Sequence, residues 1–287
     1  MHLNAFYRNL SEPGISMKKY YDSDGKLKNN GCLSAKTIME HHRLISIILN
    51  TAIRWQLIEN NVAESADPPR VPHKEIDCYD EHEARKLMTI LEGNGNEQFK
   101  VMIKLILFTG LRRGEVCGLE WVDIDFNDKS LRVSRSSEYI GKKITRDKDP
   151  KTQAGRRIMT LNESAVNMLT EYKSWQDDMK KSLGDKWEEH NKLFTKWNGE
   201  PIHPDTLTAW FSDFLKANSL RHVTLHSLRH TNASLLIAAG TDVRTVSNRL
   251  GHAQTSTTLN LYTHALKSKD VEAADNLEII LRKAEGI

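Results

Sequence analysis

The sequence of 287 residues contains little cysteine and no long apolar segment. Its three cysteines, Cys32, Cys78 and Cys117, are odd in number and far apart, which argues against a disulfide framework and a zinc knuckle. No apolar run is long enough to cross a bilayer, and the first residues lack the charged and apolar regions of a signal peptide. We therefore expect a cytoplasmic protein that makes no contact with a membrane.

Clustered carboxylates are equally scarce. Asp123, Asp125 and Asp128 form the only close set, and their position just before a candidate strand favours a turn over a metal site. A nuclease that works through bound metal ions needs such a cluster. The sequence therefore disfavours a metal nuclease, and we expect no metal and no cofactor.

Charge is almost balanced over the whole chain, with a formal net charge of +3, but it is uneven along the sequence. The segment 132–157 contains nine basic and three acidic residues, so it carries 9 − 3 = +6. The basic residues are Arg132, Arg135, Lys142, Lys143, Arg146, Lys148, Lys151, Arg156 and Arg157. This density fits a solvated hairpin with scattered salt bridges, and it equally fits a surface that contacts phosphates.

Three prolines within 67–73 divide the chain into two expected domains. Before them, Ser34 can cap a helix whose apolar positions, from Ile38 to Ala52, follow the helical period and continue towards Trp55. The prolines cannot continue a helix and indicate an extended linker. We expect a helical domain at 1–66, a linker at 67–75 and a second domain at 76–287.

The second domain is expected to be mainly α with a small antiparallel β-sheet. Asp80 and Glu83 form a capping-box pattern, and the apolar helix 98–108 should break at Thr109-Gly110. The alternating residues 131–134 predict a strand that pairs with 156–161. Further helices are expected after Pro204 and at 270–283, and the polar segment 174–192 should face solvent.

Three charged side chains suggest a site on the residues alone. His226 and Arg229 are three apart at an expected helix start, so they share one face of a half-buried helix and need a partner or an anion. A turn after the apolar helix could aim Arg112 into a cleft, where Glu115 could hold it by an ion pair or could cap the next helix. Each feature also has a simpler explanation: His226 and Arg229 could form an ordinary polar helix start, and Arg112 could be an ordinary surface arginine.

Taken together with Lys151, His252 and Tyr262, these residues resemble the tyrosine recombinases, the phage integrase family. The resemblance rests on TGLRRGE at 109–115, HSLRHT at 226–231, LGH at 250–252, YTH at 262–264, and a lysine before Thr152 that resembles the lysine of the family's β-hairpin. It extends from about residue 76 to the C-terminus. The resemblance implies a two-domain fold, in which 1–66 is a helical core-binding domain with a truncated N-terminus and 76–287 is a mixed α/β catalytic domain.

The resemblance also implies a set of roles at one phosphodiester. Arg112 and Arg229 would hold its nonbridging oxygens, and Tyr262 would attack to form a 3′-phosphotyrosine. His226 would share the tyrosine's proton, and His252 would hydrogen-bond the phosphate. Lys151 would protonate the leaving 5′ oxygen, although Lys142, Lys143 and Lys148 lie on the same expected hairpin. Glu115 would support the site, and the residues expected to contact DNA are Arg132, Lys142, Lys143 and Arg156.

The implied function is site-specific recombination that integrates and excises a mobile element, a phage or a conjugative transposon. Its implied partners are double-stranded attachment-site DNA, three further copies in a tetramer, and an excision accessory protein, with the 270–283 helix docked on a neighbouring copy and the protein associated with the nucleoid. A recombinase that resolves chromosomes or plasmids remains an alternative. So does a relative that binds DNA without cutting it, which would be expected to have lost one of the chemical positions.

Overall fold

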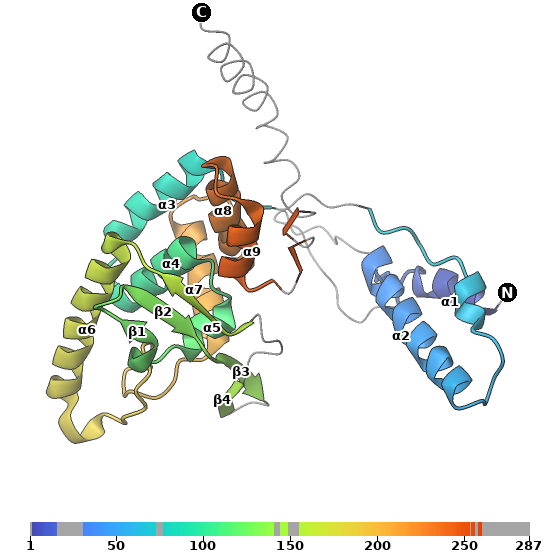
Figure 1. The fold of residues 1–287 in the computed structure, drawn as a ribbon, viewed down its shortest axis with the longest axis horizontal. Helices are drawn as coiled ribbons and strands as arrows, with labels where there is room; N and C mark the ends of the chain where they lie inside the picture. Colours follow the sequence, from blue (N-terminus) through green and yellow to red (C-terminus); the bar gives the residue numbers. More distant parts are fainter. Residues whose placement is uncertain are drawn as a thin grey trace, which may run out of the picture. The chain divides into compact units, whose positions relative to one another are not determined.

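The computed structural model describes residues 2–15, 31–72, 77–140, 144–148, 155–252, 254–255 and 258–259 (Figure 1). The chain separates into two compact units, Met1–Glu75 and Ile76–Ile287. Among the described residues, no helix has the length and apolar character needed to span a membrane. The helix expected at 270–283 lies outside these residues.

The first unit contains α1 (His2–Leu10), α2 (Ala35–Arg54) and a 3-10 turn, η1 (Val62–Ser65). The expected cap of α2 is present, because the Ser34 side chain accepts a hydrogen bond from the Thr37 amide. The Tyr7 hydroxyl shares a 2.9 Å hydrogen bond with His42 Nδ1, which joins α1 to α2.

Most of the apolar residues of α2 are not buried within this unit. Ile38 is 1% exposed, but Ile48 is 57% exposed, and Ile47 and Trp55 are also exposed. The nine residues of α1 span less than half the length of the 20-residue α2. The helical period therefore predicts the helix correctly but does not show which of its apolar residues are covered.

The second unit is built around α4 (Glu97–Thr109), which is buried on several sides: Val101, Met102, Ile103, Leu105 and Ile106 are all at most 2% exposed. It packs against α3, α5, α6 and α8. The remaining helices are α3 (Glu81–Glu92), α5 (Arg113–Gly118), α6 (Glu163–Leu183), α7 (Pro204–Ala217), α8 (Leu225–Ala238) and α9 (Val243–Leu250), with 3-10 turns η2 (Trp121–Asp123) and η4 (Gly184–Lys186). The capping box of Asp80 and Glu83 at the start of α3 is confirmed.

A small antiparallel sheet lies beside these helices in the order β1-β2-β5, with β1 at Ile124–Asp125, β2 at Ser130–Val133 and β5 at Arg157–Thr160. The expected pairing of β2 with β5 is confirmed, with Leu131 opposite Met159 and both side chains buried. The acidic set before β2 does form a turn, since Asp125 accepts hydrogen bonds from the amides of Asn127 and Asp128.

A second, two-stranded sheet is formed by β3 (Ser136–Ile140) and β4 (Ile144–Lys148) within the basic segment. Buried Lys192 anchors it by pairing with Asp147 of β4 and, at 2.9 Å, with Glu120. Lys192 and Gln176 are buried, so the expectation that 174–192 faces solvent is wrong at these two positions. Each has a polar partner there, since Gln176 accepts a hydrogen bond from Trp121 Nε1.

Candidate active site

The turn between α4 and α5 places Arg112. Gly110 ends α4 with φ of 68°, the left-handed conformation that glycine adopts without strain. A Cβ on Gly110 would lie 2.6 Å from Leu250 Cδ2 and 2.9 Å from Asn232 Oδ1. The chain therefore turns sharply here against α8 and α9, and Arg112 follows as the first residue outside the turn, next to α5.

Replacing Gly110 with alanine should lower the free energy of unfolding by about 2–4 kcal/mol, from left-handed strain together with overpacking. Gly95→Ala is the matched control, because a Cβ there meets nothing within 4 Å, and we expect a change within about 0.5 kcal/mol. Urea denaturation followed by circular dichroism measures both. Equal effects for the two variants would show that the close contact at Gly110 is unimportant.

Glu115 lies buried between two guanidinium groups. Its Oε1 accepts from Arg112 Nη1 at 2.7 Å, and its Oε2 accepts from the Arg112 amide at 2.9 Å. The sequence allowed Glu115 either to pair with Arg112 or to cap the next helix, and in the structure it does both. Arg157 contacts the same two oxygens, at 2.9 and 3.2 Å. Burial alone would raise the pKa of Glu115, but its bonds to Arg157 and Arg112 hold that pKa below its ordinary value.

Arg229 lies on α8 and is 1% exposed. Its Nη1 donates to the carbonyl of Gly110 at 2.6 Å, and its Nη2 donates to the carbonyl of Leu250. We expected this buried cation to need a partner or an anion, and two main-chain carbonyl oxygens are among its partners. Through these two bonds Arg229 joins the turn that carries Arg112 to the turn that carries His252.

Three histidines lie around the two arginines. His226 is partly exposed. The partial desolvation of its ring, followed by the charges of Arg229 and Arg112, lowers its pKa, and the same causes lower the pKa of His252 to about 4. His230 packs edge-on against His226, with ring centroids 4.6 Å apart, and burial and its charged neighbours lower its pKa to about 4 as well. All three imidazoles are therefore neutral at pH 7 in the absence of an added negative charge.

The structure brings together Arg112, Glu115, His226, Arg229 and His252, which we call the cation cluster. The Gly251 carbonyl accepts from Arg112 Nη2 at 3.4 Å, which ties the Arg112 side chain to the His252 turn. His252 Nδ1 shares a 2.8 Å hydrogen bond with buried Thr258 Oγ1. Among the expected site residues, Lys142, Lys143, Lys151 and Tyr262 lie outside the described residues.

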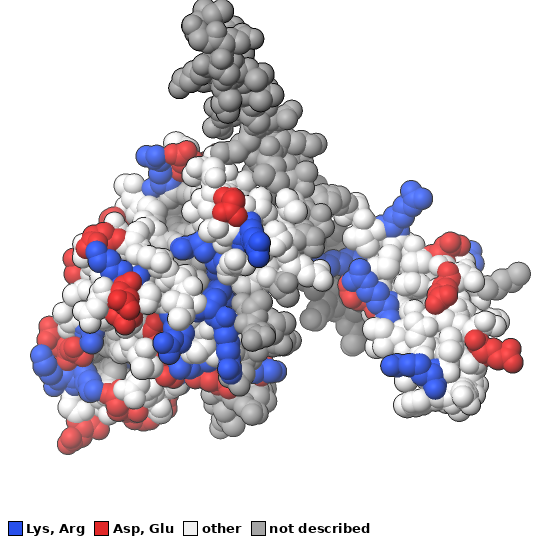
Figure 2. All heavy atoms as spheres, in the orientation of Figure 1, with Lys and Arg blue, Asp and Glu red and all other residues white. Residues whose placement is uncertain are grey.

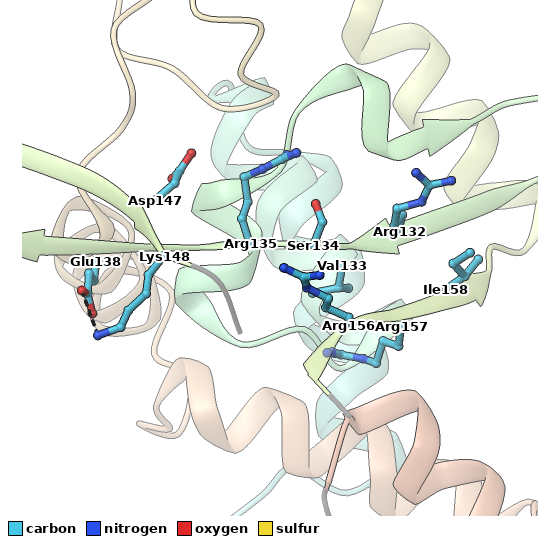
Figure 3. Close-up of a pocket in the computed structure, with 10 residues that line it drawn as sticks. All are labelled: Arg132, Val133, Ser134, Arg135, Glu138, Asp147, Lys148, Arg156, Arg157 and Ile158. Carbon is cyan, nitrogen blue, oxygen red and sulfur yellow. Dashed lines mark ion pairs between the residues drawn. The ribbon is translucent and has the colours of Figure 1, made fainter. Parts of the chain in front are cut away.

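A groove of about 1190 Å³ runs beside the cluster and holds the other expected DNA contacts (Figure 3). Exposed Arg132 of β2 and Arg156, which directly precedes β5, both line it, together with Arg135 and Lys148. Figure 3 shows Lys148 paired with Glu138 on the opposite strand. Figure 2 shows lysine and arginine side chains forming a band on this unit. The groove can accept a polyanion.

Arg157, His230 and Thr258 belong to the site geometry but were not identified from the sequence. Arg157 was only one of nine cations in the basic segment, and its strand position alone does not distinguish an inward from an outward side chain. The alternation of β5 could have marked it, since Arg157 and buried Met159 are two residues apart and so share one face of the strand. His230 was not selected from the sequence, because His226 and Arg229 of the same motif already account for the resemblance.

Comparisons with known proteins agree with this geometry. The family model described as "Phage integrase family" matches residues 78–269. A "Tyrosine recombinase XerC-like" protein of Caldanaerobacter subterraneus subsp. tengcongensis is 29% identical over 280 residues, covering 92% of this chain and 70% of the relative. The ICEBs1 integrase of Bacillus subtilis is 25% identical over 280 residues, covering 98% and 75%.

Among solved structures, the Tn1549 transposon integrase in complex with a circular intermediate DNA has the same fold. It matches with a TM-score of 0.68 and 24% identity, over 80% of this chain and 75% of that one. The family match covers more than half of the 287 residues and includes Arg112, Arg229, His252 and Tyr262. The chain therefore belongs to the phage integrase family and is a tyrosine-type site-specific recombinase.

Proposed function

We propose that this recombinase cuts and rejoins double-stranded DNA through a 3′-phosphotyrosine at Tyr262, and that it integrates and excises a mobile element. The observation that carries the proposal is the cation cluster. Arg112 and Arg229 come from elements more than 100 residues apart, yet both are tied to the short turn 250–252 through its main-chain carbonyls. The chemistry of a phosphodiester explains why these groups would be held together.

Attack on a phosphodiester concentrates negative charge on the nonbridging oxygens. Guanidinium groups fixed before the reaction can stabilise that charge without reorganising. Arg229 is held in place by two carbonyls, and Arg112 is held by Glu115 and Gly251. In the described ranges no group of three or more histidine, cysteine, aspartate or glutamate side chains could hold a metal ion. The cationic groups that the described residues bring together here are the guanidiniums of Arg112 and Arg229.

Two neutral imidazoles complete the site. His226 can accept the phenolic proton of Tyr262, because the lowered pKa leaves its ring neutral at pH 7. When Thr258 donates to His252 Nδ1, the remaining proton of that ring lies on Nε2 and can be donated to a phosphate oxygen. Bound phosphate adds negative charge and would raise the pKa of both rings.

The roles of the two remaining groups, Tyr262 and Lys151, are carried over from the family resemblance, because both residues lie outside the described ranges. Tyr262 would attack phosphorus, the 5′ oxygen would leave with a proton from Lys151, and the phosphotyrosine would conserve the bond energy. Attack by a new 5′ hydroxyl then reverses the step, so religation needs no ATP.

The names of the relatives point to a mobile element as the origin of the DNA. The Bacillus subtilis relative is called an ICEBs1 integrase, and the structural relative is a transposon integrase bound to a circular intermediate. Other relatives are Xer-type recombinases, which support resolution of chromosomes or plasmids as the second candidate. A tetramer on paired sites, docking of the 270–283 helix on a neighbouring copy and an excision accessory protein are part of the mobile-element proposal.

The proposal predicts a covalent adduct between the protein and DNA that forms in the presence of EDTA. The substrate is a duplex from the ends of the element that encodes the chain, with a nick beside the cleavage site so that the cut fragment diffuses away and religation is blocked. A denaturing gel then separates the adduct from free DNA. A scrambled duplex of the same length is the matched control.

Absence of an adduct, or an adduct only with added Mg²⁺, would contradict the mechanism. Element ends that form no adduct while a chromosomal resolution site does would favour the second candidate.

A further inference from the structure

Arg157 is a second, buried arginine behind Arg112. Its side chain is 7% exposed, as is that of Glu115, and the two form a two-pronged ion pair at 2.9 and 3.2 Å. Arg157 Nη1 also donates to the carbonyl of Gly155 at 3.2 Å, and Arg157 Nε donates to the carbonyl of Arg249 at 2.6 Å. The guanidinium therefore contacts α5, α9 and the residue Gly155, which lies just before β5.

Glu115 has no acceptor site left over. A carboxylate offers about four lone-pair positions, and Glu115 uses them for two bonds from Arg112 and two from Arg157. Glu115 therefore stays ionised and takes no proton in the reaction. Its function is to hold the Arg112 guanidinium in one orientation.

The charges of these three residues explain why two arginines share one carboxylate. Arg112, Arg157 and Glu115 together carry +1. If Glu115 paired with Arg112 alone, the pair would be neutral, and the attraction of Arg112 for a phosphate would be largely cancelled. Arg157 supplies the compensating charge from the buried side, while the Arg112 side chain, 41% exposed, reaches towards solvent.

Arg157 also connects this carboxylate to the histidine turn. The carbonyl of Arg249 that it binds is three residues before His252, and the next carbonyl, of Leu250, is the one that Arg229 binds. The Arg157 side chain thus links Glu115, which orients Arg112, to the residue that precedes the 250–252 turn.

We propose that Arg157 is a positioning residue for DNA cleavage, which keeps the charge and orientation of Arg112 available to the scissile phosphate by sharing Glu115 with it. This inference rests on the proposed function, because it assigns Arg157 a part in the same phosphoryl transfer. Although Arg157 is among the residues that line the groove, its side chain is only 7% exposed and its guanidinium is engaged by Glu115, Gly155 and Arg249, so we assign it no direct contact with the phosphate. Its effect should therefore be on the rate of cleavage in the bound complex and much less on DNA affinity.

The test compares four variants with the unaltered protein on the nicked duplex. Arg157→Met removes the charge and the fork, and Arg157→Lys keeps the charge without the fork. Glu115→Gln combined with Arg157→Met restores the sum of charges to +1, because the remaining Arg112 faces a neutral amide. Arg113→Met is the matched control, since Arg113 lies beside Arg112 but pairs with exposed Asp205 at 2.6 Å.

The measurements are the single-turnover rate constant for adduct formation at saturating DNA, the DNA dissociation constant, and the melting temperature of each variant. We expect Arg157→Met to slow cleavage by about 100-fold and Arg157→Lys by about 10-fold. DNA affinity should change by no more than about threefold, because the exposed arginines of the groove, Arg132 and Arg156, are unaltered. The double variant should be about 10-fold faster than Arg157→Met, and Arg113→Met should stay within about twofold of the unaltered protein.

Recovery in the double variant separates a charge-sharing role from a structural one, because losing both halves of a buried ion pair would not speed up cleavage if Arg157 served packing alone. A double variant that is no faster than Arg157→Met while folded would overturn the inference. If Arg157→Met does not fold, the cleavage rates of Arg157→Lys and of the double variant are compared instead. Charge sharing predicts that the double variant cleaves at least as fast as Arg157→Lys, and a purely structural role predicts that it cleaves more slowly. An unaltered protein that forms no adduct would instead refute the proposed function.

Discussion

Tyr262→Phe is expected to abolish the covalent protein–DNA adduct, reducing strand cleavage on the order of 10⁴-fold or more. Phenylalanine lacks the oxygen that attacks phosphorus, and a water molecule that attacked in its place would leave no bond between the protein and DNA. DNA binding should persist, because the cation cluster and the arginine-lined groove are unaltered. The variant should therefore shift a labelled duplex in a native gel and leave no adduct in a denaturing gel.

Three other tyrosines of the chain, Tyr7, Tyr79 and Tyr172, are unsuited to take over. Burial raises the pKa of Tyr7, and it raises that of Tyr79 to about 12 and that of Tyr172 further still. A phenol reacts as its phenolate, so each of these changes makes attack harder. The hydroxyls of Tyr79 and Tyr172 are also engaged, donating to the carbonyls of Arg221 and Leu193.

Tyr79→Phe is the matched control for the loss of one hydroxyl. It removes the hydrogen bond to Arg221, which should lower the free energy of unfolding by about 1 kcal/mol but leave adduct formation unchanged. Mass spectrometry of a nuclease-trimmed adduct identifies the linked residue directly. An adduct that survives Tyr262→Phe, or one linked to another tyrosine, would show that the nucleophile has been assigned to the wrong residue.

Local features of the fold were the most predictable from sequence. Ser34, Asp80 and Gly110 carry their structural signals in their own chemistry, as side-chain acceptors before a helix or as a residue that accepts a left-handed turn. These three features depend on neighbours within a few residues, which the sequence displays. The pairing of 130–133 with 157–160 joins segments that are farther apart, and it followed from the alternation of apolar and polar residues in 131–134.

Features that depend on distant contacts were not predictable in the same way. Nothing near Arg157 in the chain indicates that its guanidinium meets Glu115, 42 residues earlier, or the carbonyl of Arg249, 92 residues later. Lys192 is similar, since a lysine in a polar segment looks exposed until Asp147 and Glu120 are found beside it. The buried face of α2 could not be assigned either, because it depends on what else in the unit covers it.

The two arginines that we propose hold the phosphate, Arg112 and Arg229, were equivalent from the sequence, and the structure separates them. Arg112 is 41% exposed and is held by one carboxylate and one carbonyl. Arg229 is 1% exposed and bridges the carbonyls of Gly110 and Leu250. Substitution by lysine preserves the charge at either position but cannot reproduce two diverging N–H donors.

Arg229→Lys is therefore expected to impair both folding and cleavage. A lysine ammonium can reach one of the two carbonyls, and the buried acceptor left without a donor costs about 1–3 kcal/mol of unfolding free energy. Arg112→Lys should change the unfolding free energy by less than about 1 kcal/mol, because the Arg112 side chain is 41% exposed and buried Glu115 keeps its two bonds from Arg157. Both variants should cleave about 10²- to 10³-fold more slowly in single-turnover assays with saturating DNA.

Urea denaturation of the two lysine variants, beside cleavage assays on the folded fraction, tests this separation. Equal loss of stability would mean that the two carbonyl bonds of Arg229 contribute little to the fold. Full cleavage by folded Arg229→Lys would mean that Arg229 stabilises the fold and that Arg112 alone binds the phosphate. We expect both variants to lose cleavage rate but only Arg229→Lys to lose much stability. Arg229 joins the Arg112 turn to the His252 turn, so the bonds that would orient it towards a phosphate also hold the two turns together.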